Sequence, residues 1–337
     1  MPKVTVLMPT YNVAPYVKEA VESVLRQTYH DFELLVVDDC STDGTLDVVR
    51  SIKDERIRVV RNDSNLGLAD NLNRGLSLIT TELVARMDGD DIAEPNWLGE
   101  EVSVLEKHPE IGVCGGCGKR FGTSDSLIVL PESHEDCLVN MLFSCSILVP
   151  VFRYELYSRY GMRYRKDAFP AEDYRFWADC SKVTRFHNVQ KVLFHYRMHE
   201  TQICTSLKEI QVGKADEVRR LMLDWLSEDM TDDDRNYFLN SFVLGEIHDK
   251  KTLDERREFA RKLCRLNLKH KHYDNDALRR GLSNRIRLGV YSTAISDYFE
   301  SGYSLKAYRN YLKSGVAFNA EPKLEAKLLI KSVLGRS

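Results

Sequence analysis

Residues 4–12 read VTVLMPTYN, residues 32–39 read FELLVVDD and residues 83–91 read LVARMDGDD. Each stretch begins with a short, nearly continuous apolar run and ends in polar or acidic residues. Such runs are typical of strands that are buried on both faces of a parallel sheet. Because segments with helical periodicity separate them, the sequence predicts an α/β fold with a mostly parallel sheet covered by helices.

The predicted elements continue this alternation. Strands are predicted at residues 4–8, 32–37, 57–60, 83–87, 111–116 and 192–198, and helices at about 15–25, 45–53, 68–79 and 96–108. Pro9 is expected to end the first strand, and Pro15 suits the first turn of the helix that follows. The glycine-containing segments 115–118 and 122–124 are interpreted as loops.

The second half of the chain differs in pattern and in charge. From about residue 207 only helical periodicity is found, so we predict an α/β domain at residues 1–205 and a helical region at residues 206–337. Residues 256–337 contain 18 Lys and Arg against 7 Asp and Glu, a surplus of +11, whereas residues 1–255 carry −14. The helical region is therefore basic from about residue 256 and is expected to face a different partner.

Composition excludes several classes of protein. With 337 residues, 43% hydrophobic and 29% charged, the chain is neither disordered nor a disulfide-stapled miniprotein. The longest apolar stretch, residues 141–152, is shorter than the roughly 20 residues that span a bilayer. The N-terminus lacks the apolar segment of a signal peptide, so a cytoplasmic location with eight reduced cysteines is expected.

The strand ends carry the candidate chemistry. Ligands of open α/β sheets bind beyond the carboxyl ends of the strands, so residues 9–12, 38–39 and 88–91 are expected to converge. Four or five carboxylates brought together there would require a cation or a donor-rich ligand. Asp88 and Asp90 offer the hard oxygen ligands of Mg²⁺ or Mn²⁺, which commonly bridge to substrate phosphates. The alternative interpretation is a solvated acidic loop.

The order and spacing of these motifs closely resemble the nucleotide-sugar half of inverting family 2 glycosyltransferases. Three further segments lie between the motifs and belong to the same pattern: Gln27-Thr28-Tyr29, Asn65-Leu66-Gly67 and Asn73-Arg74-Gly75. The resemblance continues more weakly through residues 171–174 and 196–199, and so covers about 205 residues. It implies a GT-A fold, a donor that is usually UDP-linked, a Mn²⁺ or Mg²⁺ ion and inversion at the anomeric carbon. Residues 1–205 would then be the catalytic domain that binds donor and acceptor.

The resemblance also implies roles for individual residues. Thr10 and Tyr11 would line the nucleoside pocket, Asp39 would accept a hydrogen bond from a pyrimidine base, and Arg86 would lie along the nucleotide. Arg197 would close over the diphosphate. The nucleotide-sugar-binding set predicted in this way comprises Pro9, Thr10, Tyr11, Asp39, Asn65, Arg86, Asp88, Gly89 and Arg197.

The metal and the catalytic base are implied by two further motifs. Asp90 of the DxD motif and His199 would ligate the cation, with Asp88 as an additional candidate ligand. Glu172-Asp173 matches the acidic pair of the family, in which the second member is the general base. An inverting transfer needs such a base to take the proton of the acceptor hydroxyl. From residue chemistry alone, an acidic helix N-terminus is the favoured interpretation of the pair, and the resemblance reverses this preference.

Other side chains admit simpler interpretations. His195 and His199 have a spacing that can place both on one face, although one such histidine more often merely packs. Cys114 and Cys117 have the spacing of half a zinc site, but a strand-and-turn context explains them better. Trp97 is either a sugar-stacking platform or a core residue, while Trp177 is expected in the core.

Two departures from the commonest family pattern stand out. Gly89 replaces a residue that is usually alanine, a mild change that is not expected to remove metal binding. Glu101 stands where glutamine is frequent, and the sequence offers no explanation for it.

The combined prediction is a metal-dependent inverting hexosyltransferase of bacterial surface-polysaccharide synthesis, for example of O-antigen. It would move a hexose or N-acetylhexosamine from a UDP-sugar to a glycan or lipid-linked acceptor, such as one carried on polyprenyl diphosphate. The basic C-terminal helices could hold it peripherally on the cytoplasmic face of an anionic membrane or only pack together. No nucleic-acid-binding motif accompanies them.

Two alternative functions stay open. One is a nucleotidyltransferase, although the glycine-rich phosphate loop of such an enzyme is missing. The other is a non-catalytic sugar-binding or scaffold subunit.

Overall fold

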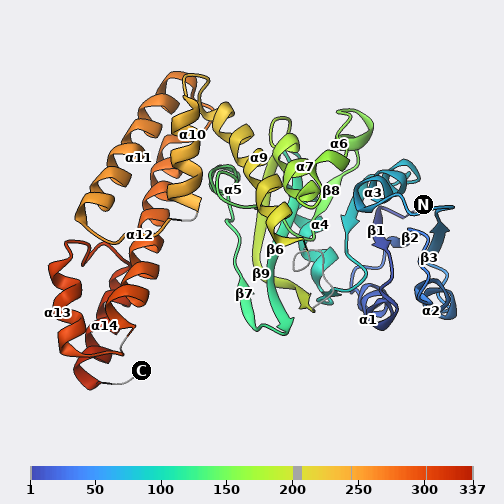
Figure 1. Ribbon diagram of the computed structural model, residues 1–337. Coiled ribbons are helices and arrows are strands. Elements are labelled where there is room, and N and C mark those ends of the chain that lie inside the picture. Colours follow the sequence, from blue (N-terminus) through green and yellow to red (C-terminus); the bar gives the residue numbers. More distant parts are fainter. Residues whose placement is uncertain (1, 200–206, 244, 301, 336–337) are drawn as a thin grey trace. The chain divides into compact units, whose positions relative to one another are not determined.

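The computed structural model describes residues 2–199, 207–243, 245–300 and 302–335. The chain forms two compact units, Met1–Val218 and Arg219–Ser337, and the division falls within helix α9 (Lys208–Leu226) (Figure 1). The predicted boundary between residues 205 and 206 lies outside the described residues, as does one of the eight cysteines, Cys204. The seven cysteines in the described part of the chain are free thiols.

The first unit is built on one mixed sheet. Its strands are β1 (Val4–Thr10), β2 (Phe32–Asp38), β3 (Ile57–Arg61), β4 (Leu83–Arg86), β5 (Ile92–Ala93), β6 (Ile111–Gly122), β7 (Ser126–Ile128), β8 (Val151–Arg153) and β9 (Arg185–Met198). The strand order is β3-β2-β1-β4-β8-β6-β9-β5, with β7 paired to β6. Strands β3, β2, β1 and β4 are mutually parallel, which confirms the predicted α/β class.

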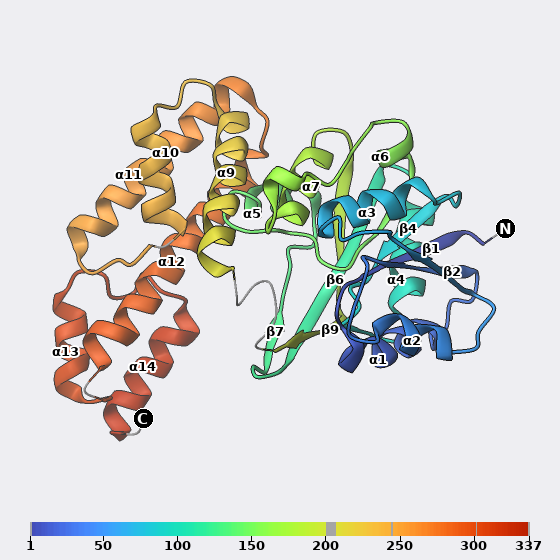
Figure 2. The ribbon, with the colours of Figure 1, turned by 45° about the vertical axis from the view of Figure 1, so that its right-hand side comes forward.

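Helices cover both faces of the parallel part. The helices of the first unit before α9 are α1 (Ala14–Leu25), α2 (Thr45–Ser51), α3 (Leu68–Ser77), α4 (Trp97–Lys107), α5 (His134–Asn140), α6 (Glu155–Ser158) and α7 (Glu172–Cys180), with a short 3₁₀ turn, η1 (Lys166–Ala168). Helix α3 lies on the opposite side of β1 and β2 from α1 and α2 in both ribbon views (Figure 2). The buried face of α1 carries Val17, Ala20, Val21 and Val24, which belong to the same core cluster as apolar residues of β1 and β2.

The central strand β1 runs past the proline that was expected to end it. All seven residues of β1 are buried, and Pro9 pairs with Val37 of β2. The carbonyl of Leu7 accepts a hydrogen bond from the backbone N–H of Met87. The backbone N–H and C=O groups of the odd-numbered residues of β1 therefore point toward β4. Strand β4 ends at Arg86, opposite Leu7, and the missing N–H of Pro9 therefore lies beyond the end of the ladder.

The glycines after residue 114 are strand residues and not loop residues. Strand β6 continues through them to Gly122, paired with β9, which begins seven residues earlier than predicted. A Cβ atom at Gly116 would lie 2.5 Å from Leu193 Cδ1, and one at Gly118 would lie 2.5 Å from Phe194 Cζ. These glycines allow the large side chains of β9 to lie directly over the backbone of β6. The interpretation of these glycines as loop residues was therefore wrong.

Both tryptophans of this unit are core residues. Trp97 is fully buried at the start of α4, and its indole N–H donates to the carbonyl of Val149 over 3.0 Å. Trp177 is 1% exposed and packs edge-on against Phe152. The suggestion that Trp97 stacks on a sugar is therefore wrong, because no part of its ring reaches solvent.

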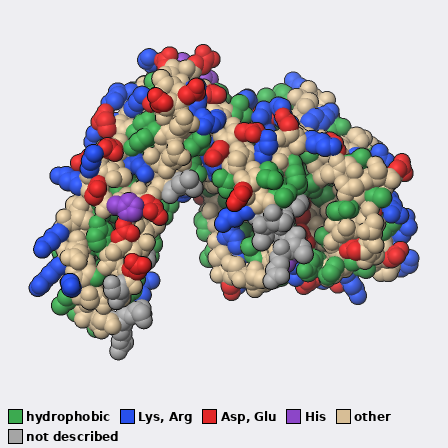
Figure 3. Space-filling model, viewed as in Figure 1, with side chains coloured by type: hydrophobic (Ala, Val, Ile, Leu, Met, Phe, Trp, Pro, Cys, Tyr) green, Lys and Arg blue, Asp and Glu red, His purple; other side chains and the backbone are tan. Residues whose placement is uncertain are grey.

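The second unit is helical, as predicted. Beyond α9, its helices are α10 (Asp232–Phe238), a π turn η2 (Leu239–Val243), α11 (Lys250–His270), α12 (Asn275–Phe299), α13 (Leu305–Lys313) and α14 (Pro322–Leu334). Its core includes Leu253, Val290, Tyr311 and Leu328. Basic side chains lie along the α11 side of this unit (Figure 3). In the described parts of the chain, no helix is both long and apolar enough to cross a bilayer.

A buried carboxyl group explains the glutamate that stands where glutamine is frequent. Glu101 of α4 is completely buried; one carboxyl oxygen accepts a hydrogen bond from the Val151 N–H over 2.7 Å, and the other has no hydrogen-bond partner among the described residues. Burial raises the pKa of Glu101 well above its ordinary value. Burial thus favours the neutral acid form in the folded protein, a form that glutamine imitates.

This predicts a pH-dependent stability that Glu101→Gln removes. The folded protein keeps a proton that the unfolded chain releases above about pH 4.3, so the free energy of unfolding falls as pH rises, by up to about 1.4 kcal/mol per pH unit. Urea denaturation at several pH values should show Glu101→Gln more stable than wild type near neutral pH and equal to it in acid. Glu55→Gln, at an exposed position, is the control. Parallel curves for wild type and Glu101→Gln would contradict the prediction.

Candidate active site

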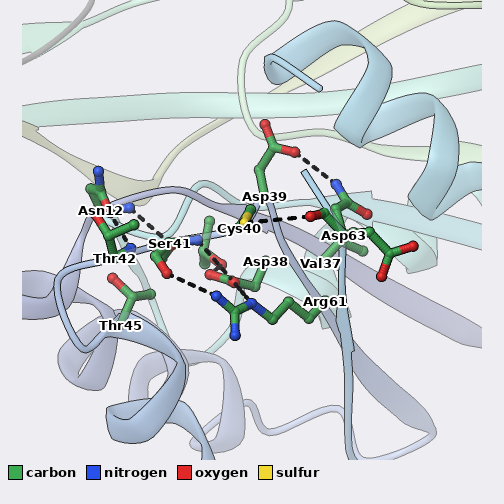
Figure 4. A network of polar contacts seen from close by, with 12 residues as sticks. Asn12, Val37, Asp38, Asp39, Cys40, Ser41, Thr42, Thr45, Arg61 and Asp63 are labelled. Atoms are coloured by element: carbon green, nitrogen blue, oxygen red, sulfur yellow. Dashed lines mark hydrogen bonds and ion pairs between the residues drawn. The ribbon is translucent and has the colours of Figure 1, made fainter. Parts of the chain in front are cut away.

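The loops after β1 and β2 are joined by side-chain hydrogen bonds (Figure 4). The backbone N–H of Asn12 donates to Ser41 Oγ over 3.0 Å, and the N–H of Thr42 donates to Asn12 Oδ1 over 2.9 Å. Asn12 and Cys40 both have positive φ, +52° and +64°, a conformation that turns the chain sharply at each strand end. The two predicted ligand-binding strand ends are therefore one connected structure.

The two carboxylates of Asp38 and Asp39 point in opposite directions (Figure 4). Asp38 accepts a hydrogen bond from the Ser41 N–H over 3.1 Å and lies 3.7 Å from the guanidinium of Arg61. This carboxylate stabilises the loop and faces away from a ligand that Asp39 would bind. The expectation that all the strand-end carboxylates crowd together is thus not met at β2.

Asp39 accepts three hydrogen bonds from other groups of the protein. Its oxygens accept from Asn62 Nδ2 at 2.7 Å and from the N–H groups of Leu66 and Gly67, both at 2.9 Å. A carboxylate accepts about four hydrogen bonds, so capacity for roughly one more remains. The predicted interaction with a pyrimidine base would use that remaining site, while two of the existing bonds hold the 66–67 loop beside it.

The other nucleotide-sugar-binding candidates lie around this edge. Pro9 and Thr10 are buried at the end of β1, whereas Tyr11 is 48% exposed and Asn65 is exposed. Gly89 lies against this same edge: a Cβ atom there would be 2.9 Å from Thr10 Cγ2. Glycine at this position therefore permits a close approach between the end of β1 and the loop that follows β4.

The three aspartates after β4 each have a separate partner. Asp88 Oδ1 accepts from Arg86 Nε over 3.2 Å, and Asp90 Oδ2 lies 3.1 Å from His199 Nε2. Asp91 accepts from the backbone N–H of Arg197 over 2.8 Å. The structure thus brings together Asp90 and His199, the two residues that were predicted as metal ligands.

The mutual repulsion of these carboxylates is expressed in their pKa values. Burial and, secondly, the charge of Asp88 raise the pKa of Asp90, while His199 opposes that rise. Burial and the charge of Asp90 raise the pKa of Asp91 well above its ordinary value. A cation or a donor-rich ligand bound at Asp88 and Asp90 would relieve this repulsion.

The donor set suits a hard divalent cation, although it is incomplete by itself. In the described ranges, no group of three or more His, Cys, Asp and Glu side chains is arranged to hold a metal ion. The carboxylate of Asp90 and the imidazole of His199 lie together, and a bound ion would take its remaining ligands from waters and substrate phosphates, as many Mg²⁺ and Mn²⁺ ions do. His195 does not join this set, because its Nε2 lies 2.5 Å from Glu94 Oε1.

Arg197 is held beside the acidic motif by contacts that the sequence did not reveal. Its Nη2 donates to Glu19 over 2.6 Å and its Nε donates to the carbonyl of Asp90 over 2.7 Å. The guanidinium lies 5.0 Å from the ring centre of Tyr16 and 4.5 Å from that of Phe121. Tyr16 and Glu19 are one turn apart on α1, a spacing too common to have signalled this role.

Arg86 connects the acidic motif to the predicted catalytic base. It is 9% exposed, forms a two-pronged contact with Asp88, and its Nη2 lies 4.0 Å from Glu172 Oε1. Its guanidinium also lies 5.5 Å from the centre of the Tyr164 ring. One buried cation therefore serves carboxylates from β4 and α7.

The acidic pair begins helix α7, as both interpretations of the sequence required. Burial and, secondly, the charge of Asp173 raise the pKa of Glu172 to about 7. Burial also raises the pKa of Asp173, while Arg86 lowers it. Asp173 is half-buried, and its Oδ1 accepts a hydrogen bond from the N–H of Tyr174 over 2.6 Å. It is thus both a helix-terminal acid and a carboxylate that faces the Arg86 charge.

Comparison with known proteins identifies the chain. Residues 5–171 match the family model described as glycosyl transferase family 2. An uncharacterized glycosyltransferase of Haemophilus influenzae is 33% identical over 235 residues, which are 65% of this chain and 72% of that protein. The chain belongs to glycosyl transferase family 2.

Other relatives of this family 2 glycosyltransferase come from Bacillus subtilis. One, named EpsE, is 42% identical over 34% of this chain and 42% of that protein. Another, TuaG, is named as a teichuronic acid biosynthesis glycosyltransferase and is 36% identical over 43% of this chain and 60% of that protein.

Solved structures show the same GT-A fold. S. aureus TarS, residues 1–349, crystallised with UDP-GlcNAc, matches with a TM-score of 0.60 at 19% identity, covering 89% of this chain and 93% of that one. A mannosyltransferase from Pyrobaculum calidifontis, in complex with GDP-Man and Mn²⁺, matches with a TM-score of 0.51 at 18% identity and covers 99% and 87% of the two chains.

The close approach of Gly89 to Thr10 predicts a coupled pair of substitutions. Gly89→Ala should lower the free energy of unfolding by about 1–3 kcal/mol, because its Cβ atom would overlap Thr10 Cγ2. Thr10→Ser removes that methyl group, so the double variant should be more stable than the sum of the two single effects. Urea denaturation of the four proteins measures the coupling, and strictly additive effects would refute the proposed contact.

Proposed function

We propose that this glycosyltransferase moves a hexose or N-acetylhexosamine from a UDP-sugar to a saccharide acceptor, with inversion at the anomeric carbon. The observation that carries the proposal is the position of Arg86. It contacts Asp88 of the donor-side motif and Glu172 of the acidic pair, so the donor and the base act within reach of one cation. A site that joins two reactants requires such closeness.

The proposed reaction needs one base and one leaving-group stabiliser. Asp173 takes the proton of the acceptor hydroxyl as that oxygen forms the new bond to the anomeric carbon. The bond from that carbon to the phosphate oxygen breaks, and the nucleoside diphosphate leaves with the bonding electrons. Burial raises the pKa of Asp173, which makes its carboxylate a stronger base.

The leaving diphosphate is proposed to bind beside Asp88 and Asp90. These residues, with His199, would hold a Mn²⁺ or Mg²⁺ ion, whose charge would offset that of the diphosphate. The repulsion between the aspartates supports this assignment. Arg197 supplies a further positive charge 2.7 Å from the Asp90 carbonyl, and it would reach a diphosphate by leaving Glu19.

The donor and acceptor classes are proposed from relatives. TarS was crystallised with UDP-GlcNAc, and TuaG is named for teichuronic acid synthesis. We therefore propose a UDP-sugar donor and a bacterial surface polysaccharide, such as O-antigen or a glycan on polyprenyl diphosphate, as the product. The mannosyltransferase complex contains GDP-Man, so GDP-mannose is the competing donor to include in a screen.

A peripheral membrane contact is proposed for helix α14. Leu329, Ile330 and Val333 on this helix are 42%, 57% and 61% exposed. Lys327 and Lys331 lie one turn apart on the same helix. Exposed apolar residues beside lysines are typical of helices that rest on an anionic membrane surface, which would place the enzyme on the cytoplasmic face of the inner membrane.

Asp173→Asn tests the assignment of the base. Removal of a general base should lower kcat by about 10²- to 10⁴-fold, while the Kd for uridine diphosphate stays within a factor of two or so. Initial-rate assays and titration calorimetry measure the two effects. Asp167→Asn, an exposed surface change, is the control. If Asp173→Asn retains substantial turnover, Asp173 is not the base.

Chelation tests the metal site separately. Uridine diphosphate should bind in the presence of Mn²⁺ and lose affinity in excess EDTA, because the diphosphate and the carboxylates then repel each other. Asp90→Asn in Mn²⁺ should bind no better than wild type in EDTA, whereas Asp47→Asn, at an exposed position, should bind as wild type does. Equal affinity with and without the metal would overturn the proposed site.

A further inference from the structure

The second unit contains a cavity of about 720 Å³ between α11, α12 and residues 318–322. Five arginines line it: Arg257, Arg261 and Arg265 from α11, and Arg279 and Arg287 from α12. We call this cavity the arginine groove. Its lining includes no acidic residue. Nothing in the proposed transfer reaction uses it.

The neighbouring acids neutralise these arginines only in part. A single carboxylate, Glu258, accepts from both Arg261 at 2.8 Å and Arg265 at 3.0 Å. The ion pairs of Arg257 with Asp254 and of Arg279 with Asp276 are longer, at 3.8 Å and 3.6 Å. In the part of the chain that the structure describes, no ion pair is found for Arg287. The groove therefore keeps a net positive charge.

The arrangement of the arginines along α11 is unfavourable for the helix alone. Arg257, Arg261 and Arg265 follow one another at intervals of four residues, so like charges lie next to each other on one face. Such pairs destabilise an isolated helix, and alternating signs would stabilise it. An anion bound between them would turn this repulsion into attraction. Arginine suits phosphate oxygens in particular, because its planar guanidinium donates two parallel hydrogen bonds.

The groove also has exposed apolar side chains in its lining. Phe318 is 72% exposed and has a φ of +63°, a backbone conformation that is uncommon for residues other than glycine, asparagine and aspartate. Leu268, on α11, is 49% exposed. A small hydrophilic anion makes no use of these side chains, whereas an amphipathic molecule would cover them with its apolar part.

We propose that the arginine groove binds the phosphate headgroup of a membrane lipid, with Phe318 and Leu268 against the beginning of its apolar chain. This deepens the membrane contact proposed above, to which it adds a specific headgroup site, and it does not depend on the transfer reaction. The charge of the groove selects an anion, and the apolar residues select a lipid over a free phosphate.

Vesicle sedimentation with the full chain tests the proposal. The wild type should bind phosphatidylcholine vesicles that contain phosphatidic acid and should bind pure phosphatidylcholine weakly. Arg261→Gln combined with Arg287→Gln should weaken binding by about tenfold or more, because it removes two of the five guanidinium groups that line the groove. Lys306→Gln combined with Arg309→Gln removes the same charge from exposed positions of α13 and should have a much smaller effect.

Two outcomes of that comparison would overturn the proposal. Equal losses in the two double variants would show diffuse attraction of the whole basic surface, and no loss in the groove variant would show that the groove is not used. Circular dichroism and binding of uridine diphosphate verify that each variant is folded. Unchanged donor binding together with lost vesicle binding would support the groove proposal independently of the transfer reaction.

Inorganic pyrophosphate and Phe318→Gly distinguish a lipid from a soluble phosphate. Glycine adopts positive φ without strain, so Phe318→Gly should keep the fold while removing the apolar contact. It should weaken vesicle binding and leave the binding of pyrophosphate, measured by calorimetry, unchanged. If the groove variant loses pyrophosphate binding but binds vesicles like the wild type, the site serves a soluble phosphate and the lipid assignment is wrong.

Discussion

The repulsion among three carboxylates within four residues is the constraint on which the site depends. Asp88, Asp90 and Asp91 follow a buried strand, and burial in a low dielectric makes their mutual repulsion costly. The fold supplies each with a positively polarised partner from a different element: a guanidinium on β4, an imidazole after β9 and a backbone N–H of β9. The long strand β9 is therefore as much a part of this acidic site as the motif itself.

This division of partners also connects the proposed donor side to the proposed base through Arg86. The Arg86 guanidinium neutralises Asp88 while it lies 4.0 Å from Glu172, so any ligand that competes for Asp88 changes the electrostatic surroundings of Asp173. In the proposed reaction, binding of the donor and the basicity of the acidic pair would thus be physically linked. Tyr164 supports this arrangement from the apolar side, through its ring beneath Arg86 and its stacking on Phe176 at 4.1 Å.

Sequence reasoning succeeded where a residue's role depends on its local pattern, and failed where it depends on a neighbour far along the chain. The buried strands follow from their apolar runs, whereas the pairing of Asp90 with His199, 109 residues apart, was implied only by the family resemblance. Pro9 in the middle of a strand does not follow from such a run, because it is tolerated only where the adjacent strand has ended. The direction of Asp39 likewise depends on the N–H groups of the 66–67 loop, which the sequence does not place.

By itself the sequence determined the α/β alternation, the acidic motifs at the strand ends, the helical second half with its basic surplus and the family resemblance. Each of these follows from the spacing of residues along the chain or from their composition. Only the tertiary structure decided that Trp97 is a core residue, that Glu101 is a buried carboxyl group with a raised pKa, and that Glu19 and Phe121 flank Arg197. The reason is physical: burial and electrostatic environment are properties of neighbours in space, and chain spacing specifies such neighbours only within one helix or strand.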